Sequence, residues 1–230
     1  MSNLTKKQKI IQEKHDPEKT YSLEEAMDII QSVKSEKFDE SIDISVKLGV
    51  DPDKSDQNVR GAVTLPNSLG KEVKVAVFAD GDHASDAQAA GAEYVGMDDL
   101  AEKFQKDEVN VDVVISTNSA MKVVGKLGQV LGPKGLMPNP KTGTVSDDVV
   151  TAIKNVKAGQ VRFRTDKNGI IHGSIGKVSF EGNKIKANAS ALLDELRKLK
   201  PASAKGVYIG NIALSSTMGP GVKINPGELV

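Results

Sequence analysis

The period of the hydrophobic pattern changes twice along the chain, near Leu69 and near Gly159, and these changes restrict the possible folds most strongly. Residues 42–50 alternate apolar and polar side chains, the pattern of a strand with one buried face. Between the two changes, short apolar segments alternate with helical segments, as in a parallel sheet covered by helices. The sequence thus predicts an α/β protein. A middle domain inserted into a discontinuous outer domain fits this pattern, although the pattern alone does not decide it.

Turn and cap residues predict where individual elements begin and end. Ser22 with Glu25 three positions later forms a capping-box signature, so a helix should begin there and run to about residue 33. The Asp-Lys-Asn-Gly sequence at 166–169 should form a hairpin turn between strands at 160–165 and 170–180. The other expected elements are strands at 73–79, 94–95, 111–115 and 206–214, helices at 86–90, 98–105, 119–130 and 191–199, and a helix over 149–156 that Ser146 caps.

The composition excludes several classes of function. The chain has no cysteine, which rules out disulfides, thiol chemistry and thiolate metal sites. Its three histidines, His15, His83 and His172, stand singly and lack the paired spacing of metal ligands, so we expect no metal and no cofactor. The longest apolar runs are only as long as strands, and no signal-peptide stretch follows the basic N-terminus. We therefore expect a cytoplasmic protein without a membrane span.

The charge is balanced overall but unevenly distributed. The chain holds 31 basic and 31 acidic side chains, which argues against a strongly electrostatic nucleic-acid binder. Residues 160–230 nevertheless carry 11 basic and 5 acidic groups, whereas residues 1–67 and residues 68–159 each carry 10 basic and 13 acidic groups. Positive charge is thus concentrated in the last third of the chain.

Residues 125–144 form an unusual segment rich in glycine, proline and lysine. A nucleotide-binding loop would need a GxxxxGK[ST] or GxGxxG fingerprint, and neither occurs. Three prolines also remove backbone donors that a phosphate cradle requires. Two interpretations stay open: an ordered loop that presents Lys126, Lys134 and Lys141 to a polyanion, or a purely structural connection.

Two further segments have a functional and a structural interpretation. Residues 80–83 (DGDH) follow an expected strand, where α/β folds bind ligands, but the same residues suit a turn and a helix N-cap. Residues 215–219 (SSTMG) offer hydroxyl groups for phosphate or ribose, a methionine for a sugar or base face, and a glycine for close backbone approach. These are the means of RNA binding, although a structural turn remains the alternative.

Four groups of residues, in order across nearly the whole chain, resemble the ribosomal protein L1 family of bacteria. They are residues 37–40 (KFDE), 51–52 (DP) with 55–61 (SDQNVRG), 131–141 (LGPKGLMPNPK) and 217–220 (TMGP). The resemblance implies an outer RNA-binding α+β domain, residues 1–68 with 160–230, and an inserted Rossmann-like three-layer α/β domain, residues 69–159.

The same resemblance implies a function and a set of partners. The family binds 23S-type ribosomal RNA of the mobile stalk in the large subunit, beside the tRNA exit site, and it assists the release of deacylated tRNA. It also represses translation of its own messenger RNA by binding a mimic of the ribosomal site. We expect a non-enzymatic protein without cofactor that is monomeric outside the cytoplasmic ribosome.

The resemblance also assigns RNA-binding residues to this chain. Lys37 and Phe38 match one contact region, and the segment from Ser215 through Ser216, Thr217 and Met218 to Gly219 matches the second. Neighbours of this surface on the expected hairpin are Arg164, Asp166, Lys167 and His172. Lys126, Lys134 and Lys141 resemble a secondary RNA-facing loop. A buried core position for Phe38 and a satisfied strand position for His172 are the alternatives.

Two rival functions remain testable. A small-ligand or nucleotide-binding Rossmann-like enzyme would need a glycine fingerprint after residues 77–79, which the sequence lacks. A protein-binding scaffold would show no salt-sensitive retention of RNA. Residues 66–70 and 157–159 are expected to act as hinges, because both connections are rich in glycine or proline.

Overall fold

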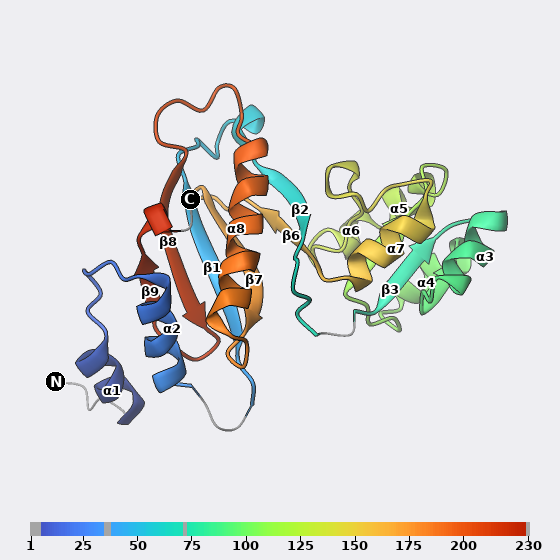
Figure 1. The fold of residues 1–230 in the computed structure, drawn as a ribbon. Helices are drawn as coiled ribbons and strands as arrows, with labels where there is room; N and C mark the ends of the chain where they lie inside the picture. The colour runs from blue at the N-terminus through green and yellow to red at the C-terminus, as the bar shows by residue number, and fades with distance from the viewer. Residues whose placement is uncertain (1–5, 35–37, 71–72, 229–230) are drawn as a thin grey trace. The chain divides into compact units, whose positions relative to one another are not determined.

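The protein is an α/β protein, as predicted, and it divides into two compact units (Figure 1). The computed structural model describes residues 6–34, 38–70 and 73–228. Unit 1 combines Met1–Leu69 with Val161–Val230, and unit 2 consists of Gly70–Gln160.

A four-stranded antiparallel sheet forms the frame of unit 1. Its strand order is β7-β1-β8-β9. The bounds are β1 Ser41–Leu48, β7 Ile170–Lys177, β8 Ile209–Ser216 and β9 Gly221–Ile224. The strict alternation predicted for residues 42–50 is confirmed, because Ile42, Ile44, Val46 and Leu48 are buried while the residues between them are at least partly exposed.

Two helices cover one face of this sheet (Figure 1). They are α2 Leu23–Ser32 and α8 Gly182–Lys198, and they pack against each other as well as against the strands. The predicted capping box of α2 is confirmed: Ser22 Oγ accepts the Glu25 N–H, and the Glu25 carboxylate accepts the Ser22 N–H. Each large aliphatic side chain buried between helices and sheet contributes roughly 1.5–3 kcal/mol to folding.

The predicted hairpin at 166–169 is correct as a turn but wrong as a strand pair. The Asp166 N–H does donate to the Ile170 carbonyl, at 2.9 Å. However, β6 Gln160–Arg164 pairs with β2 Arg60–Thr64 in a separate two-stranded sheet, whereas β7 pairs with β1. The strand β2 is not part of the larger sheet, and β6 pairs with β2 instead of with β7. Hydrogen bonds next to these strands, such as that from the Thr165 N–H to the Val59 carbonyl, hold β6 beside β2.

Unit 2 is a three-stranded parallel sheet between helices, of order β4-β3-β5. All residues of β3 and β5 are buried, which explains why both strands read as continuous apolar runs. The bounds in this unit are β3 Val75–Phe78, α3 Gly81–Ala89, β4 Tyr94–Gly96, α4 Asp98–Gln105, β5 Val113–Ser116, α5 Met121–Lys126, α6 Gly128–Leu131 and α7 Val149–Lys157.

Several expected boundaries differ from those observed. The helix expected over 119–130 is two short helices, α5 and α6, and the cap of α7 is Asp148 rather than Ser146, because the Asp148 carboxylate accepts the Thr151 N–H. The strand expected over 206–214 continues to Ser216 in β8. The remaining elements are α1 Lys6–Lys14 and three short 3₁₀ helices, η1 Ser55–Gln57, η2 Pro140–Thr142 and η3 Pro226–Glu228.

Candidate nucleic-acid interface

The turn at residues 217–219, which joins β8 to β9, is fastened to the beginning of β1. The Ser41 N–H donates to Thr217 Oγ1, and the Thr217 N–H donates to the Ser41 carbonyl, both at 3.1 Å. The Met218 N–H donates to Glu40 Oε2, also at 3.1 Å. The backbone of this turn is therefore fixed by β1 before any partner binds.

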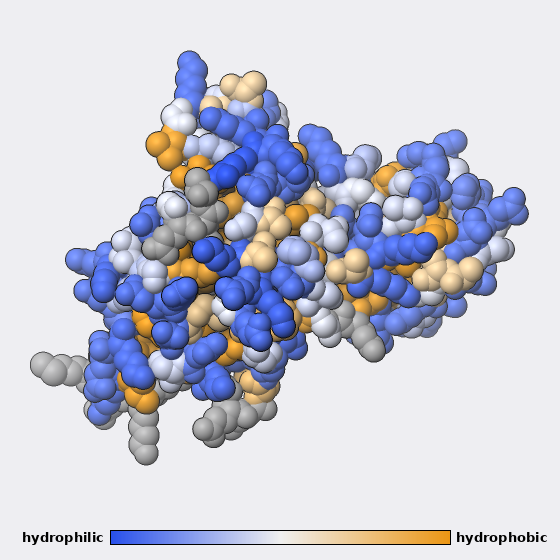
Figure 2. Space-filling model, viewed as in Figure 1, coloured by the Kyte–Doolittle hydropathy of each residue, from blue (hydrophilic) through white to orange (hydrophobic). Residues whose placement is uncertain are grey.

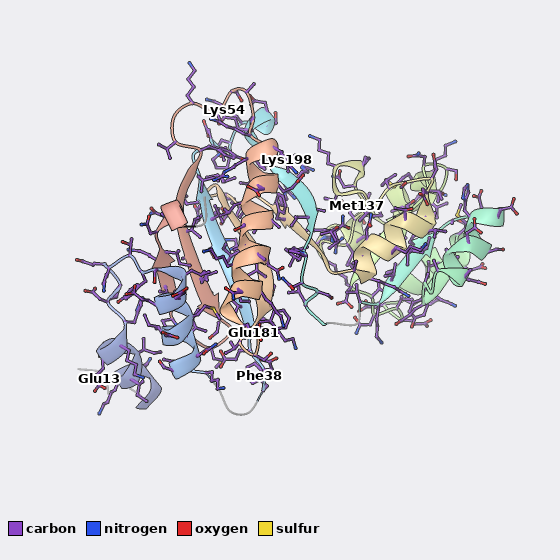
Figure 3. The ribbon with its side chains drawn as sticks, in the orientation of Figure 1. Glu13, Phe38, Lys54, Met137, Glu181 and Lys198 are labelled. Atoms are coloured by element: carbon purple, nitrogen blue, oxygen red, sulfur yellow. The ribbon has the colours of Figure 1, made fainter. Side chains whose placement is uncertain are left out.

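The side chains of the turn, unlike its backbone, face solvent. Met218 is 59% exposed, although methionine is usually buried, and Thr217 is also exposed. Phe38, two residues before Glu40, is 49% exposed and lies at the end of unit 1 where β1 begins (Figure 3). This exposure rules out the alternative of a buried core position for Phe38. Lys37, which was predicted to bind RNA beside it, lies outside the described residues.

Ser216 must be removed from the predicted contact surface. Because β8 extends to this residue, side chains alternate across the sheet, so Ser215 points to the solvent side and Ser216 points to the core with only 4% exposed. Ser216 pairs with the buried Ile42. Its Oγ is buried and has no hydrogen-bond partner among the described residues.

The sheet face opposite α2 and α8 carries small and polar side chains that remain partly or fully exposed. We call this surface the open sheet face. The strand registers place its members opposite one another. They are Ser41, Asp43, Ser45 and Lys47 on β1, His172, Ser174 and Lys177 on β7, Asn211, Ala213 and Ser215 on β8, and Gly221 and Lys223 on β9.

The open sheet face connects the 217–219 turn with the turn at 166–169. Lys47 Nζ donates to the Asn168 carbonyl at that second turn. Ser41 and Lys47 are six residues apart on β1, so at roughly 3.3 Å per residue the two turns bound a strip about 20 Å long. On the opposite, helix-covered side, Figure 2 shows hydrophilic side chains interspersed with hydrophobic ones, and charged side chains of α8 are among the exposed residues.

At the 166–169 turn, Asp166 organises the backbone and contacts His172. Its Oδ1 accepts the N–H groups of Ile170 and Asn168, both at 2.8 Å. The hydrogen bond from Ile170 is the main cause that holds the Asp166 pKa below its usual value, followed by those from Asn168 and His172. His172 is 59% exposed and its Nδ1 lies 3.2 Å from Ser45 Oγ, so it is both bonded in the sheet and accessible.

The two other predicted residues near this turn, Lys167 and Arg164, are exposed. Lys167 is part of the turn itself, whereas Arg164 ends β6 in the separate two-stranded sheet. The structure thus brings Asp166, Lys167 and His172 together at one end of the open sheet face, and it places Phe38, Thr217 and Met218 at the other end.

The three lysines of the predicted secondary loop, Lys126, Lys134 and Lys141, are all exposed on unit 2. Lys126 ends α5, and Lys141 lies in η2, where the Asn139 side chain accepts its backbone N–H. Lys134 forms an ion pair with the exposed Asp107, which reduces its free positive charge. The loop is therefore ordered and partly basic.

The structure gives a structural role to part of the DGDH segment. Asp80 occupies the N-cap position of α3, although its side chain makes no capping hydrogen bond to a described residue, and Gly81 has a φ of 53°, which glycine adopts without strain. Among the residues with described placement, no group of three or more His, Asp or Glu side chains could hold a metal ion. Over the same residues, none of the helices combines the length and apolar character needed to cross a bilayer.

Most residues of the open sheet face, and Glu40 beneath the turn, were not among the RNA-binding residues predicted from the sequence. The alternation at 42–50 already places Ser41, Ser45 and Lys47 on one side of a strand, which was the available signal. Lys177 and Lys223 could not be added from sequence, because their places depend on the strand order β7-β1-β8-β9.

Comparison with known proteins identifies the family of this chain. A model of the Ribosomal protein L1p/L10e family matches residues 30–220. Large ribosomal subunit protein uL1 of Saccharophagus degradans is 58% identical over 229 residues, which span 100% of this chain and 99% of the relative. The proteins of the same name from Cellvibrio japonicus and Pseudomonas aeruginosa are 57% and 58% identical over the same shares.

These matches confirm the family that the sequence motifs indicated, and they confirm that the chain is a ribosomal protein and not an enzyme. The matched region contains the Phe38 segment, the loop around Lys134 and the 217–219 turn. The chain belongs to the ribosomal protein L1p/L10e family.

Proposed function

We propose that unit 1 binds folded 23S-type ribosomal RNA of the mobile stalk, and that the protein is thereby a constituent of the large subunit of the cytoplasmic ribosome. The observation that carries the proposal is the 217–219 turn, which holds exposed Thr217 and Met218 on a rigid backbone at the end of the open sheet face. The names of the relatives, which are large-subunit proteins, support the ribosomal partner.

The chemistry of the surface suits structured RNA better than it suits an extended polyanion. The open sheet face contains hydroxyl and amide groups, which can bond to ribose and phosphate oxygens, and few cations. Met218 and Phe38 offer apolar contact to a sugar or base. A surface of this composition recognises the shape of a folded RNA through hydrogen bonds, and it requires no excess of positive charge over the whole chain.

A filter-binding titration against a stalk ribosomal-RNA fragment, with a scrambled duplex as control, tests the proposal. Thr217→Ala should weaken binding to the stalk fragment by roughly 1–3 kcal/mol, because it removes a hydroxyl that lies at the proposed contact and also bonds the turn to Ser41. Ser216→Ala is the matched control: it removes the neighbouring hydroxyl from the buried side and should leave affinity unchanged. Equal affinity of wild type for the two RNAs, or equal effects of the two variants, would contradict the proposal.

We further propose that unit 2 makes a weaker contact with RNA through Lys126 and Lys141, and that it faces the tRNA exit site, where it assists release of deacylated tRNA. Both lysines are exposed, and neither forms an ion pair with another described residue as Lys134 does with Asp107. A double variant, Lys126→Ala with Lys141→Ala, should slow tRNA release from assembled ribosomes and should leave the affinity of unit 1 for the stalk fragment unchanged.

Repression of the protein's own messenger is proposed on the same surface. If one interface serves both RNAs, the stalk fragment should displace the messenger leader in competition, and Thr217→Ala should weaken both to a similar extent. Simultaneous binding of the two RNAs to one monomer would argue for separate sites.

The proposed RNA-binding domain consists of residues 1–68 with 160–230, and the proposed Rossmann-like domain consists of residues 69–159. We also propose that the two domains move independently about the connections at residues 66–70 and 157–159. Hydrogen bonds restrict this motion at the first connection. Asn188 accepts the Asn67 N–H and donates to the Asn67 carbonyl, both at 3.0 Å. The chain is therefore fixed to α8 through Asn67, so residue 67 is not part of the proposed hinge on this connection.

A further inference from the structure

Glu40 is a buried acidic residue surrounded by the residues that we propose to contact RNA. It is 1% exposed, which is rare for a glutamate. It directly precedes β1 and follows the exposed Phe38 by two positions. Burial of a charged group costs free energy unless hydrogen bonds compensate, so its position calls for a structural or functional reason.

The hydrogen bonds of Glu40 reach both neighbours of β1. Its Oε2 accepts the backbone N–H of Met218, at 3.1 Å, on the side of β8 and β9. Its carbonyl oxygen accepts the N–H of Val178, at 2.9 Å, on the side of β7. Glu40 thus ties the end of β7 and the 217–219 turn to the start of the central strand.

The bond to Met218 fixes a backbone whose side chain remains free. The Met218 side chain is 59% exposed while its N–H is held by a buried carboxylate. Thr217 on one side is bonded to Ser41, and the Gly219 N–H on the other donates to the Ser216 carbonyl at 3.1 Å. Each residue of the turn therefore has its own backbone anchor, and the anchor of Met218 comes from an acidic side chain.

We infer that Glu40 is a positioning residue for RNA binding, which acts by holding Met218 and the 217–219 turn in the binding conformation before RNA arrives. This inference rests on the proposed function of the turn. A hydrogen bond in a buried site of low dielectric constant is stronger than the same bond at the surface. Holding a contact loop in advance lowers the conformational entropy lost on binding, and this raises affinity without a contact from Glu40 to the RNA.

Two substitutions separate the acceptor function of Glu40 from its size and burial. Glu40→Leu removes the acceptor, and Glu40→Gln keeps an oxygen that can accept the Met218 N–H. Asn188→Ala is the matched control, because Asn188 is also fully buried and hydrogen-bonded but contacts Asn67 and Ile175 rather than the turn. Two quantities are measured for each variant: affinity for the stalk ribosomal-RNA fragment, and the hydrogen-exchange rate of the Met218 amide without RNA.

Glu40→Leu should weaken RNA binding about tenfold and speed exchange at Met218 in the free protein. Glu40→Gln should bind within about threefold of wild type, because the amide oxygen can still accept the Met218 N–H. Asn188→Ala should lose thermal stability yet keep wild-type affinity and Met218 protection. If Glu40→Leu does not fold, Glu40→Asp replaces it, since its carboxylate ends one methylene short of Met218.

The inference is overturned if the acceptor-free variant is folded, binds RNA as tightly as wild type and protects Met218 equally well. It is also overturned if Glu40→Gln is as weak as Glu40→Leu, because then the acceptor is not what matters. Failure of the proposed function has a different signature: wild type itself would not discriminate the stalk fragment from the scrambled duplex, and Thr217→Ala would have no effect.

Discussion

Gly219 and Ser216 approach each other so closely that the size of one limits the size of the other. A Cβ atom at Gly219 would lie 2.4 Å from Ser216 Oγ, whereas the next nearest atom, Ser216 Cβ, would be 3.5 Å away. Gly219→Ala should therefore lower the free energy of unfolding by about 1–2 kcal/mol through overpacking. In a Ser216→Ala background the same change should cost less than about 0.5 kcal/mol.

Urea unfolding of wild type, both single variants and the double variant measures this coupling. Ser216→Ala alone should be neutral or slightly stabilising, because it deletes a buried oxygen with no partner among the described residues. Additive effects of the two substitutions would show that the contact with Oγ is not what restricts residue 219 to glycine.

Asp166 makes the stability of the 166–169 turn depend on pH. Its pKa is lowered in the folded protein, chiefly by the Ile170 N–H, so ionised Asp166 stabilises the fold. This contribution is fully present above the pKa of an unfolded aspartate, about 3.9, and it is lost as pH falls through the lower folded pKa. The difference in unfolding free energy between wild type and Asp166→Asn should thus be constant above about pH 5 and shrink at lower pH.

Thermal unfolding from pH 3 to pH 7, followed by circular dichroism, measures that difference. Asp194→Asn is the control for removal of one negative charge, because Asp194 pairs with Arg197 on the exposed side of α8. A difference that grows on acidification would mean that the Asp166 pKa is raised, and it would contradict the hydrogen-bond geometry.

Among the elements, α8 is held in place partly by the buried polar residue Asn188. Asn188 donates to the Ile175 carbonyl at 2.7 Å and bonds twice to the backbone of Asn67, so it joins the helix to β7 and to the connection that follows β2. Asn188→Ala should cost about 1–3 kcal/mol per buried group left without a partner. Chemical denaturation measures the loss, and Ser190→Ala, two residues further along the helix, should cost much less.

The elements also show what local sequence can and cannot predict. The alternation of β1 and the capping box of α2 are local signals, and both were found because residue spacing alone determines them. The first half of α8 was missed, because Gly182, Asn183 and Asn188 disfavour a helix that packing of Ile185 and Ala189 nevertheless stabilises. The predicted pairing of β6 with β7 was wrong for a related reason: the true partner of β6 is β2, a strand distant in sequence.

At the scale of the molecule, the balanced charge predicts a weak dependence of RNA affinity on salt. The proposed surface offers about four described cations, which are Lys47, Lys167, Lys177 and Lys223. Each neutralised phosphate contributes about −0.7 to −0.9 to the slope of log affinity against log salt concentration, so the slope should be no steeper than about −4.

A titration of the stalk fragment at several salt concentrations measures the slope. Two lysine variants show which surface of the protein contributes to it. Lys223→Ala on the open sheet face should reduce the magnitude by about 0.7–0.9, whereas Lys186→Ala on α8 should leave it unchanged. A slope near −8, or equal effects of both variants, would indicate a different and more basic surface.

The candidate site was predictable in part. The resemblance to a family supplied Phe38 and the 217–219 turn, and both are exposed as contact residues must be. Ser216 was included wrongly, because the strand was expected to end at residue 214 and the alternation was not extended to it. Lys177, Lys223 and Asn211 join the surface only through the order of four strands, which local sequence does not reveal.

The central claim is that the 217–219 turn and the open sheet face together receive folded ribosomal RNA. Its most direct test is the mapping of backbone amide chemical shifts as the stalk fragment is added to labelled protein. We predict that the largest changes occur at Thr217, Met218, Ser45 and His172, with small changes along α2 and α8. Changes concentrated on those helices, with the turn unaffected, would contradict the account.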